Sequence, residues 1–167
     1  MSERIREVEK AVAGSPALDG MGGEAIFDAI YREQFVSLLR VAYLLTGSKA
    51  VAEDAVHDVF VRCRDRLADL VHPPSYLRAA VVNACRSHHR RTQRRQPVSE
   101  EPAHLPVELL ELRDALDRLS DRRRVAVTLR YFCDMDFEEI AVVLQCRPGT
   151  VRSLVHRGVN DLKGVLR

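Results

Sequence analysis

The C-terminal stretch DFEEIAVVLQCRPGTVRSLVHRGVNDLKGVL, residues 136–166, decides the fold of the last third of the chain. It predicts a short helix over 137–144, a tight turn at 145–147, and a longer helix from Pro148, whose fixed φ suits the first helical position. Asp136 and Glu139 have the spacing of a capping box, with Asp in place of the usual Ser or Thr. This order and spacing predict a helix-turn-helix, whose second helix enters the major groove of DNA.

The second helix of this motif has an inward apolar stripe at three-to-four spacing: Val151, Leu154, Val155, Val159, Leu162 and Leu166. Arginine can bond guanine through two parallel hydrogen bonds, and Ser, Thr and a helix N-terminus suit phosphate oxygens. A polar helix face is also common on proteins that bind no DNA, so the motif needs support from the rest of the chain. The candidate DNA contacts on the turn and the outward face are Arg147, Thr150, Arg152, Ser153, His156 and Arg157.

The remaining sequence predicts an all-α fold of two small helical domains. Aromatic residues make up 5% of the 167 residues, Trp is absent, and no strand-like alternation persists. Apolar periodicity predicts helices over 25–45, 49–67 and 76–91 in the first domain, and over 107–119 and 121–133 before the helix-turn-helix. The predicted organisation is a mobile arm over 1–24, a bundle over 25–91, a flexible linker over 92–106 and a second bundle over 107–167.

The linker prediction depends on Pro97, Pro102 and Pro106 in a segment without an apolar period. A tether of this kind leads us to expect two bundles with no fixed mutual arrangement until a binding partner fixes one.

The third predicted helix lies in a strongly basic window. No Asp or Glu occurs from Leu70 to Ser99. A surface without a binding role usually mixes both signs of charge, so this window predicts a nucleic-acid contact. Its arginines are Arg78, Arg86, Arg90, Arg91, Arg94 and Arg95.

Neither enzyme chemistry nor a metal site is expected. The four cysteines are widely separated and lack zinc-ligand spacing, and no glycine-rich phosphate cradle or convergent titratable group appears. We therefore expect no catalytic residue, no metal and no cofactor. No signal-peptide pattern and no stretch of membrane-spanning length is present, so we expect a cytoplasmic protein without membrane insertion.

Two separated blocks of sequence resemble the extracytoplasmic-function (ECF, group 4) sigma factors of bacterial RNA polymerase, over roughly 25–166. The first block is YLLTG at 43–47 followed by AEDAVHDVF at 52–60. The second comprises ALDRL at 115–119, RRRVAVTLRY at 122–131, EIA at 139–141 and GTVRS at 149–153. Each piece alone is a weak signal, while their order and spacing together are specific. The resemblance implies a sigma region 2-like bundle and a sigma region 4-like helix-turn-helix.

The resemblance also implies functions for three surfaces. The helix from Pro148 would bind the minus-thirty-five promoter element. The third helix would melt and read the minus-ten element through Tyr76, Arg78, Asn83, Arg86, Arg90 and Arg91. The second helix would bind the beta-prime and beta subunits of RNA polymerase core through Glu53, Asp54, His57, Asp58 and Phe60. Promoter DNA and core polymerase are thus the expected partners, and an anti-sigma factor is a further candidate.

Some residues depart from the family pattern. His57 and Asp58 stand where Gln and Glu are usual, Tyr76 where Trp is frequent, and Arg147 where Ser often caps the recognition helix. These departures leave the class unchanged but weaken any inference about promoter sequence, because base specificity depends on a few side chains.

The alternative interpretation is a helix-turn-helix transcriptional regulator whose N-terminal bundle senses a ligand or forms a dimer. The acidic residues Glu53, Asp54 and Asp58 distinguish the two, because the regulator leaves them unexplained. The resemblance therefore favours a sigma factor that binds core polymerase and directs transcription initiation.

Overall fold

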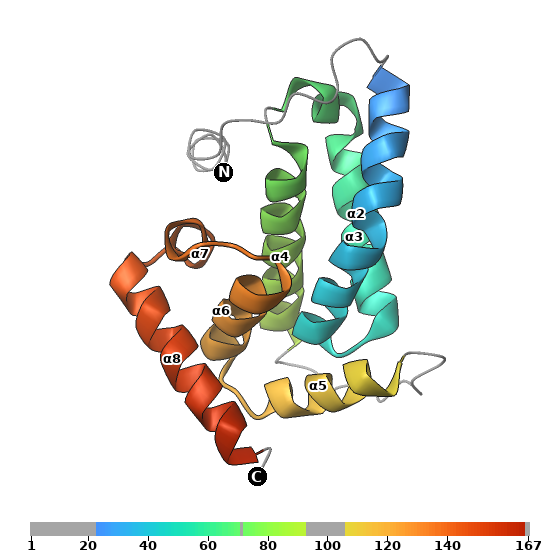
Figure 1. Ribbon diagram of the computed structural model, residues 1–167. Helices are drawn as coiled ribbons and strands as arrows, with labels where there is room; N and C mark the ends of the chain where they lie inside the picture. The colour runs from blue at the N-terminus through green and yellow to red at the C-terminus, as the bar shows by residue number, and fades with distance from the viewer. Residues whose placement is uncertain (1–22, 71, 93–105, 166–167) are drawn as a thin grey trace.

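The structure is a computed structural model that describes residues 23–70, 72–92 and 106–165 (Figure 1). All regular structure in these residues is helical, which confirms the all-α prediction. The predicted arm over 1–24 and linker over 92–106 lie almost wholly outside the described residues. No helix in the described ranges is both long enough and apolar enough to span a membrane.

The N-terminal bundle consists of three α-helices and one 3₁₀ segment: α2 (Gly23–Thr46), α3 (Lys49–Cys63), η1 (Arg64–Asp69) and α4 (Pro73–Thr92). α2 packs against both α3 and α4. Leu38, Val56 and Phe60 are almost fully buried between these helices. Ser48 caps α3 by accepting a 3.3 Å hydrogen bond from the Val51 amide, because the first turn of a helix has amides without intrahelical partners.

Two predicted boundaries in this bundle are wrong. α4 begins at Pro73 instead of Tyr76, because proline lacks only an amide that the first helical turn does not use. The Tyr76 amide already donates to the His72 carbonyl at 3.1 Å, so the helix has begun before Tyr76. α3 ends at Cys63, and the chain continues as a 3₁₀ turn instead of an α-helix to 67.

The C-terminal bundle consists of α5 (Val107–Asp117), α6 (Asp121–Phe132), α7 (Phe137–Leu144) and α8 (Pro148–Val165). The predicted capping box is present at the start of α7. The Glu139 amide donates to Asp136 Oδ1 at 2.7 Å, and the Asp136 amide donates to Glu139 Oε2 at 2.8 Å. Gln145 ends α7 in the left-handed region with φ of 53°, which turns the chain sharply into α8. The predicted helix-turn-helix is therefore confirmed.

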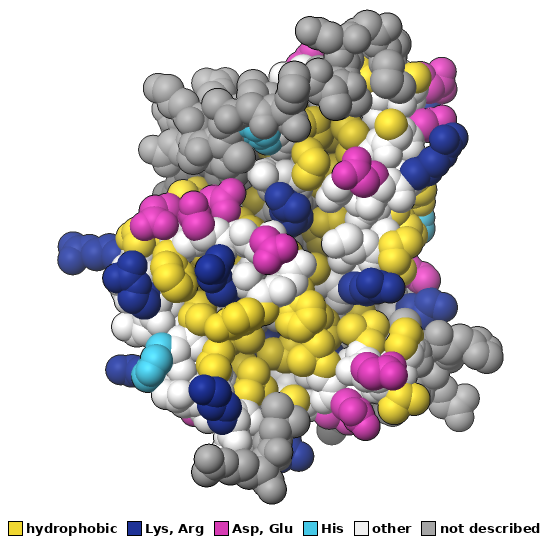
Figure 2. All heavy atoms as spheres, viewed as in Figure 1, with side chains coloured by type: hydrophobic (Ala, Val, Ile, Leu, Met, Phe, Trp, Pro, Cys, Tyr) yellow, Lys and Arg dark blue, Asp and Glu magenta, His cyan; other side chains and the backbone are white. Residues whose placement is uncertain are grey.

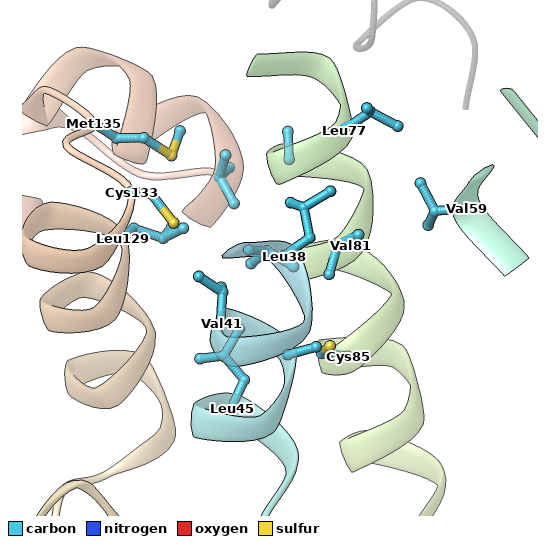
Figure 3. Close-up of a cluster of buried hydrophobic side chains, with 14 of the residues drawn as sticks. Leu38, Val41, Leu45, Val59, Leu77, Val81, Cys85, Leu129, Cys133 and Met135 are labelled. Atoms are coloured by element: carbon cyan, nitrogen blue, oxygen red, sulfur yellow. The ribbon is translucent and has the colours of Figure 1, made fainter. Parts of the chain in front are cut away.

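The two bundles pack against each other, contrary to the expectation that they have no fixed mutual arrangement. Leu38, Val41 and Leu45 of α2 lie in the same apolar cluster as Leu129 of α6 and Met135 after it. Figure 3 shows these side chains pointing toward one another between α2, α4 and α6. Sequence periodicity did not predict this seam, because it gives the apolar face of a helix but does not say which distant helix covers that face.

Candidate nucleic-acid interface

The outward face of α8 carries the candidate DNA contacts that the sequence predicts for the helix-turn-helix. The inward stripe is well buried at Val151 and Val155, which fixes the rotation of the helix. Figure 2 shows Lys and Arg side chains along α8 and acidic side chains gathered over α7. The structure leaves exposed all six predicted residues of this face: Arg147, Thr150, Arg152, Ser153, His156 and Arg157.

The Arg152 side chain is held against the first helix of the motif. Its guanidinium carbon lies 5.2 Å from the centroid of the Phe137 ring, and that of Arg130 lies 5.4 Å from the same centroid. A cation over an aromatic face is stabilised by about 0.5–1 kcal/mol at exposed sites. This contact limits the directions in which Arg152 extends, so the side chain is partly preorganised near the start of α8.

Other polar groups on α8 interact within the helix. The Ser153 hydroxyl donates to the Gly149 carbonyl at 3.0 Å, and the Asn160 amide lies 3.4 Å from the His156 ring. The Arg147 carbonyl accepts from the Thr150 and Val151 amides, which places Arg147 at the N-cap of α8. Such short-range bonds break at little cost when a DNA phosphate or base competes for the same groups.

Two contacts that the sequence analysis missed seat α8 on α6. A Cβ added to Gly158 would lie 2.6 Å from Cγ2 of Val127, so the helices cross at a point where only glycine fits without adjustment. Arg123 of α6 also forms a 2.7 Å ion pair with Asp161 of α8. Gly158 stands seven residues after Val151, in register with the inward stripe, and that register was the available signal.

The candidate minus-ten residues on α4 are less uniformly exposed than the candidates on α8. Asn83 is exposed, whereas Tyr76, Arg78 and Arg86 are half-buried. Arg78 donates to the Ser75 hydroxyl at 3.2 Å, and Arg86 donates to the Val143 carbonyl of α7 at 2.8 Å.

Two further candidate minus-ten residues lie near the C-terminal end of α4. Arg90 and Arg91 lie in the last turns of α4, and their side chains fall outside the described part of the structure.

The acidic candidates belong to α3, which lies on the far side of the N-terminal bundle from α8 (Figure 1). Asp54, His57 and Asp58 are exposed, and Glu53 is half-buried. Lys49 approaches Glu53 at 3.8 Å, and Arg62 pairs with Asp58 at 3.3 Å. Exposed pairs of this kind are weak, so both carboxylates remain available to a partner.

Phe60 does not share this exposure. Its side chain is 1% exposed, so a partner docked on α3 would not touch it. The ring packs edge-on against Tyr31, with centroids 4.8 Å apart, and lies beneath the acidic surface. The prediction that Phe60 binds core polymerase directly is therefore corrected: the residue supports the surface from below.

His57 is fixed on this surface by two hydrogen bonds. Its Nδ1 lies 3.0 Å from the Glu53 carbonyl, which only accepts, so Nδ1 carries a proton. In the neutral ring Nε2 then accepts from the Tyr31 hydroxyl at 3.4 Å. The ring also lies 5.2 Å from that of Phe35, so the imidazole continues the aromatic layer of α2.

Cys85 and Cys133 are two of the buried thiols among the four cysteines. Burial raises the pKa of Cys85 to about 12 and that of Cys133 to about 11, and in Cys133 the nearby Arg78 charge partly opposes the rise. Thiols with such pKa values carry almost no thiolate at neutral pH. Within the described ranges, no group of three His, Cys, Asp or Glu side chains is arranged to hold a metal ion.

Comparison with known families defines the class of protein. The family model for sigma-70 region 2 matches residues 30–95, and the model for sigma-70 region 4 matches residues 109–162. These ranges fall on the two bundles, and the second contains α7 and most of α8. The fold therefore belongs to a sigma-70-type subunit of RNA polymerase, which is not an enzyme in its own right.

Individual relatives narrow the class. The RNA polymerase sigma-E factor of Streptomyces antibioticus is 30% identical, over 84% of this chain and 85% of its own length. The ECF RNA polymerase sigma factor SigE of Mycolicibacterium smegmatis is 27% identical, over 92% of this chain and 67% of its own length. The chain belongs to the ECF RNA polymerase sigma factors: it binds RNA polymerase and directs promoter recognition and transcription initiation.

A solved structure shows the same fold. The sigma factor RpoE of Bartonella quintana, crystallised with the anti-sigma factor NepR, matches with a TM-score of 0.67 and 24% identity. The match covers 83% of this chain and 97% of that one.

Proposed function

We propose that three surfaces of the chain divide the work of a sigma factor. The region 2 unit over 25–91 docks on polymerase core through Glu53, Asp54, His57 and Asp58 of α3. The same unit engages the minus-ten element through α4. The linker over 92–106 joins it to the region 4 unit over 107–167, whose helix α8 enters the major groove at the minus-thirty-five element.

The outward face of α8 carries this proposal. Six polar or basic residues of one turn and one helix face are all exposed, while the opposite face is buried against α6. Arg152 near the helix start suits a base edge, because a guanidinium can bond guanine in a bidentate manner. Arg157, more than a turn further along, suits a phosphate.

Core docking through α3 is supported by charge and geometry. Four candidate side chains lie along successive turns of one helix, at positions 53, 54, 57 and 58, and three of them are exposed. Among the described residues Asp54 forms no ion pair, so its charge is the least compensated of the three carboxylates. We propose a complementary basic surface on the beta-prime subunit as its main contact, with the beta subunit as the second.

Two further proposals concern the setting. We place the protein in the cytoplasm, where RNA polymerase works. Because the Bartonella relative is crystallised with an anti-sigma factor, we propose a partner of that kind for this chain as well.

Charge reversal tests the core-docking surface. The double variant Asp54→Lys/Asp58→Lys should bind purified core polymerase at least about tenfold more weakly, because like charges facing each other across an interface cost several kcal/mol. The matched control is Glu24→Lys/Asp28→Lys, which has the same spacing and comparable exposure on α2. Equal core affinities of the two folded variants would contradict the assignment.

A further inference from the structure

The side chain of Phe137, in the first turn of α7, contacts the candidate base-reading residue of α8. The Arg152 guanidinium carbon lies 5.2 Å from the centroid of the Phe137 ring. The ring is half-buried because it also packs against the apolar core. Phe137 is therefore a fixed support, whereas the Arg152 side chain above it is exposed to solvent.

The contact with the ring leaves the hydrogen-bond donors of Arg152 free. In the described part of the chain, no hydrogen bond or ion pair engages the Arg152 guanidinium. The carboxylates of Asp136 and Glu139, on either side of Phe137 in the sequence, each accept from a backbone amide in the capping box. An ion pair would occupy N–H donors, whereas attraction of a cation to a ring face does not. Arg152 can therefore stay over Phe137 and bond a guanine edge at the same time.

A second arginine, Arg130 of α6, restricts Arg152 further. Its guanidinium carbon lies 5.4 Å from the same ring centroid, and its Nη1 donates to the Met135 carbonyl at 3.0 Å. This hydrogen bond ties Arg130 to the segment between α6 and α7, so the part of the ring that Arg130 contacts is closed to Arg152. Two like charges on one ring also repel each other, which keeps the two guanidinium groups apart.

Restriction of Arg152 before binding affects base selection. An arginine side chain has many rotamers, and ordering them at an interface opposes binding. A side chain that is already placed loses less freedom, and it reaches fewer alternative groups, such as a phosphate or the edge of a neighbouring base. The contact with Phe137 therefore favours the preferred base and disfavours its competitors.

We propose that Phe137 is a specificity-determining residue of the minus-thirty-five interface, whose ring positions Arg152 for one base without touching that base. The proposal rests on the base-reading function of Arg152 proposed above. It extends that function to the first helix of the motif, on which the sequence predicts no DNA contact. Phe137 is a positioning residue, because it acts through Arg152.

The test compares holoenzymes reconstituted with the full-length wild-type, Phe137→Leu and Phe137→Tyr chains. Leucine keeps an apolar side chain on the core but removes the ring, whereas tyrosine keeps the ring face. Competition binding with duplexes that differ at one base pair measures the discrimination between bases. The base pair to vary is the one at which Arg152→Ala relaxes the sequence preference.

The proposal predicts that Phe137→Leu lowers this discrimination about two- to fivefold, which is the strength of an exposed cation–ring contact expressed as an affinity ratio. Phe137→Tyr should keep the wild-type discrimination. The matched control is Phe132→Leu, the same replacement at a 40%-exposed ring in the last turn of α6, and it should keep the wild-type value too. Unchanged discrimination by Phe137→Leu would overturn the proposal.

A double-mutant cycle separates positioning from a purely structural role. In the Arg152→Ala background, Phe137→Leu should lower discrimination no further, because the group that the ring positions is absent. A loss of the same size in both backgrounds would overturn the positioning role. If circular dichroism shows that Phe137→Leu has lost helicity, Phe137→Met takes its place with the same expected result, since methionine adapts to irregular apolar sites and also lacks the ring.

The single variant Arg152→Ala distinguishes failure of this proposal from failure of the function on which it rests. An Arg152→Ala chain with unchanged base preference would overturn both the base-reading function and the positioning role. A relaxed preference in Arg152→Ala together with wild-type discrimination in Phe137→Leu would overturn only the positioning role.

Discussion

The two helices that carry most of the candidate DNA contacts, α8 and α4, present them very differently. On α8 every predicted residue is exposed, and the helix is seated from behind by α6. On α4 only Asn83 is exposed among the described candidates, and Arg86 is bonded to the other bundle. Arginine side chains are therefore exposed and available to DNA on α8, whereas Arg86 of α4 is hydrogen-bonded to another part of the chain.

This difference teaches which property decides whether a basic residue is available. The outward face of α8 follows from its own apolar stripe, because a buried stripe fixes what the opposite side exposes. The face of α4 is determined by a bundle that begins more than ten residues after α4 ends. The local sequence pattern therefore predicts the exposed face of α8 well and that of α4 poorly.

The largest expected effect is on base reading by α8. Arg152→Ala should weaken promoter binding by about 1–3 kcal/mol and relax sequence preference at one or two positions of the upstream element, because a bidentate base contact is lost. Selection of binding sites from a random library by the reconstituted holoenzyme measures both quantities. An unchanged preference would remove Arg152 from the base-reading role.

The next effect concerns the seat of α8 on α6. Gly158→Ala introduces a Cβ 2.6 Å from Val127, and we expect overpacking of about 1–3 kcal/mol to outweigh the gain in helix propensity of about 1 kcal/mol. Gly164→Ala on the same helix meets nothing within 4 Å and should be neutral or stabilising. Urea unfolding of both variants measures the difference.

Relief of this contact sharpens the test. Val127→Ala introduced into the Gly158→Ala background should restore part of the lost stability, because the clashing methyl group is gone. Additive losses in the double variant would show that the two residues do not meet.

A smaller effect is expected at the start of α7. Asp136→Ala removes the side chain that accepts from the Glu139 amide, which should cost about 1 kcal/mol of stability. Glu138→Gln, at the neighbouring exposed position, keeps the cap and should cost only a few tenths of a kcal/mol as a lost dipole interaction. Equal losses in urea unfolding would assign the effect to charge instead of capping.

The smallest expected effect separates the two arginines of α8. Arg157→Ala should weaken binding to all promoter sequences alike and lower the slope of log affinity against log salt by about one, because a single phosphate contact is lost. Titrations at several salt concentrations measure the slope. A changed base preference with an unchanged slope would exchange the roles of Arg157 and Arg152.

Much of the local structure could be predicted from the sequence. The capping box at Asp136 and the start of α8 at Pro148 each depend on residues within four positions of one another, and both are present. The start of α4 at Pro73 could not be predicted in this way, because a proline is compatible both with a break before a helix and with its first turn.

The contacts between distant segments could not be predicted in the same way. Gly158 stood in register with the inward stripe, but only the position of Val127 shows why a side chain is excluded there. Phe60 belonged both to an apolar stripe and to a block that resembles the core-binding segment, and only its burial against Tyr31 separates support from contact. The sequence did not indicate what buries Leu44, because the residues of its cluster, Leu116, Leu119 and Val127, lie some seventy or more residues further along the chain.

Footprinting of the reconstituted holoenzyme tests the central claim, that α8 and α4 serve separate promoter elements, most directly. On a promoter selected by the wild-type protein, Arg152→Ala should lose protection of the minus-thirty-five element. Asn83→Ala should instead lose strand opening at the minus-ten element, measured by permanganate reactivity, while keeping upstream protection. If Asn83→Ala lost upstream protection as completely as Arg152→Ala did and opened the strands normally, the division of labour between the two helices would be contradicted.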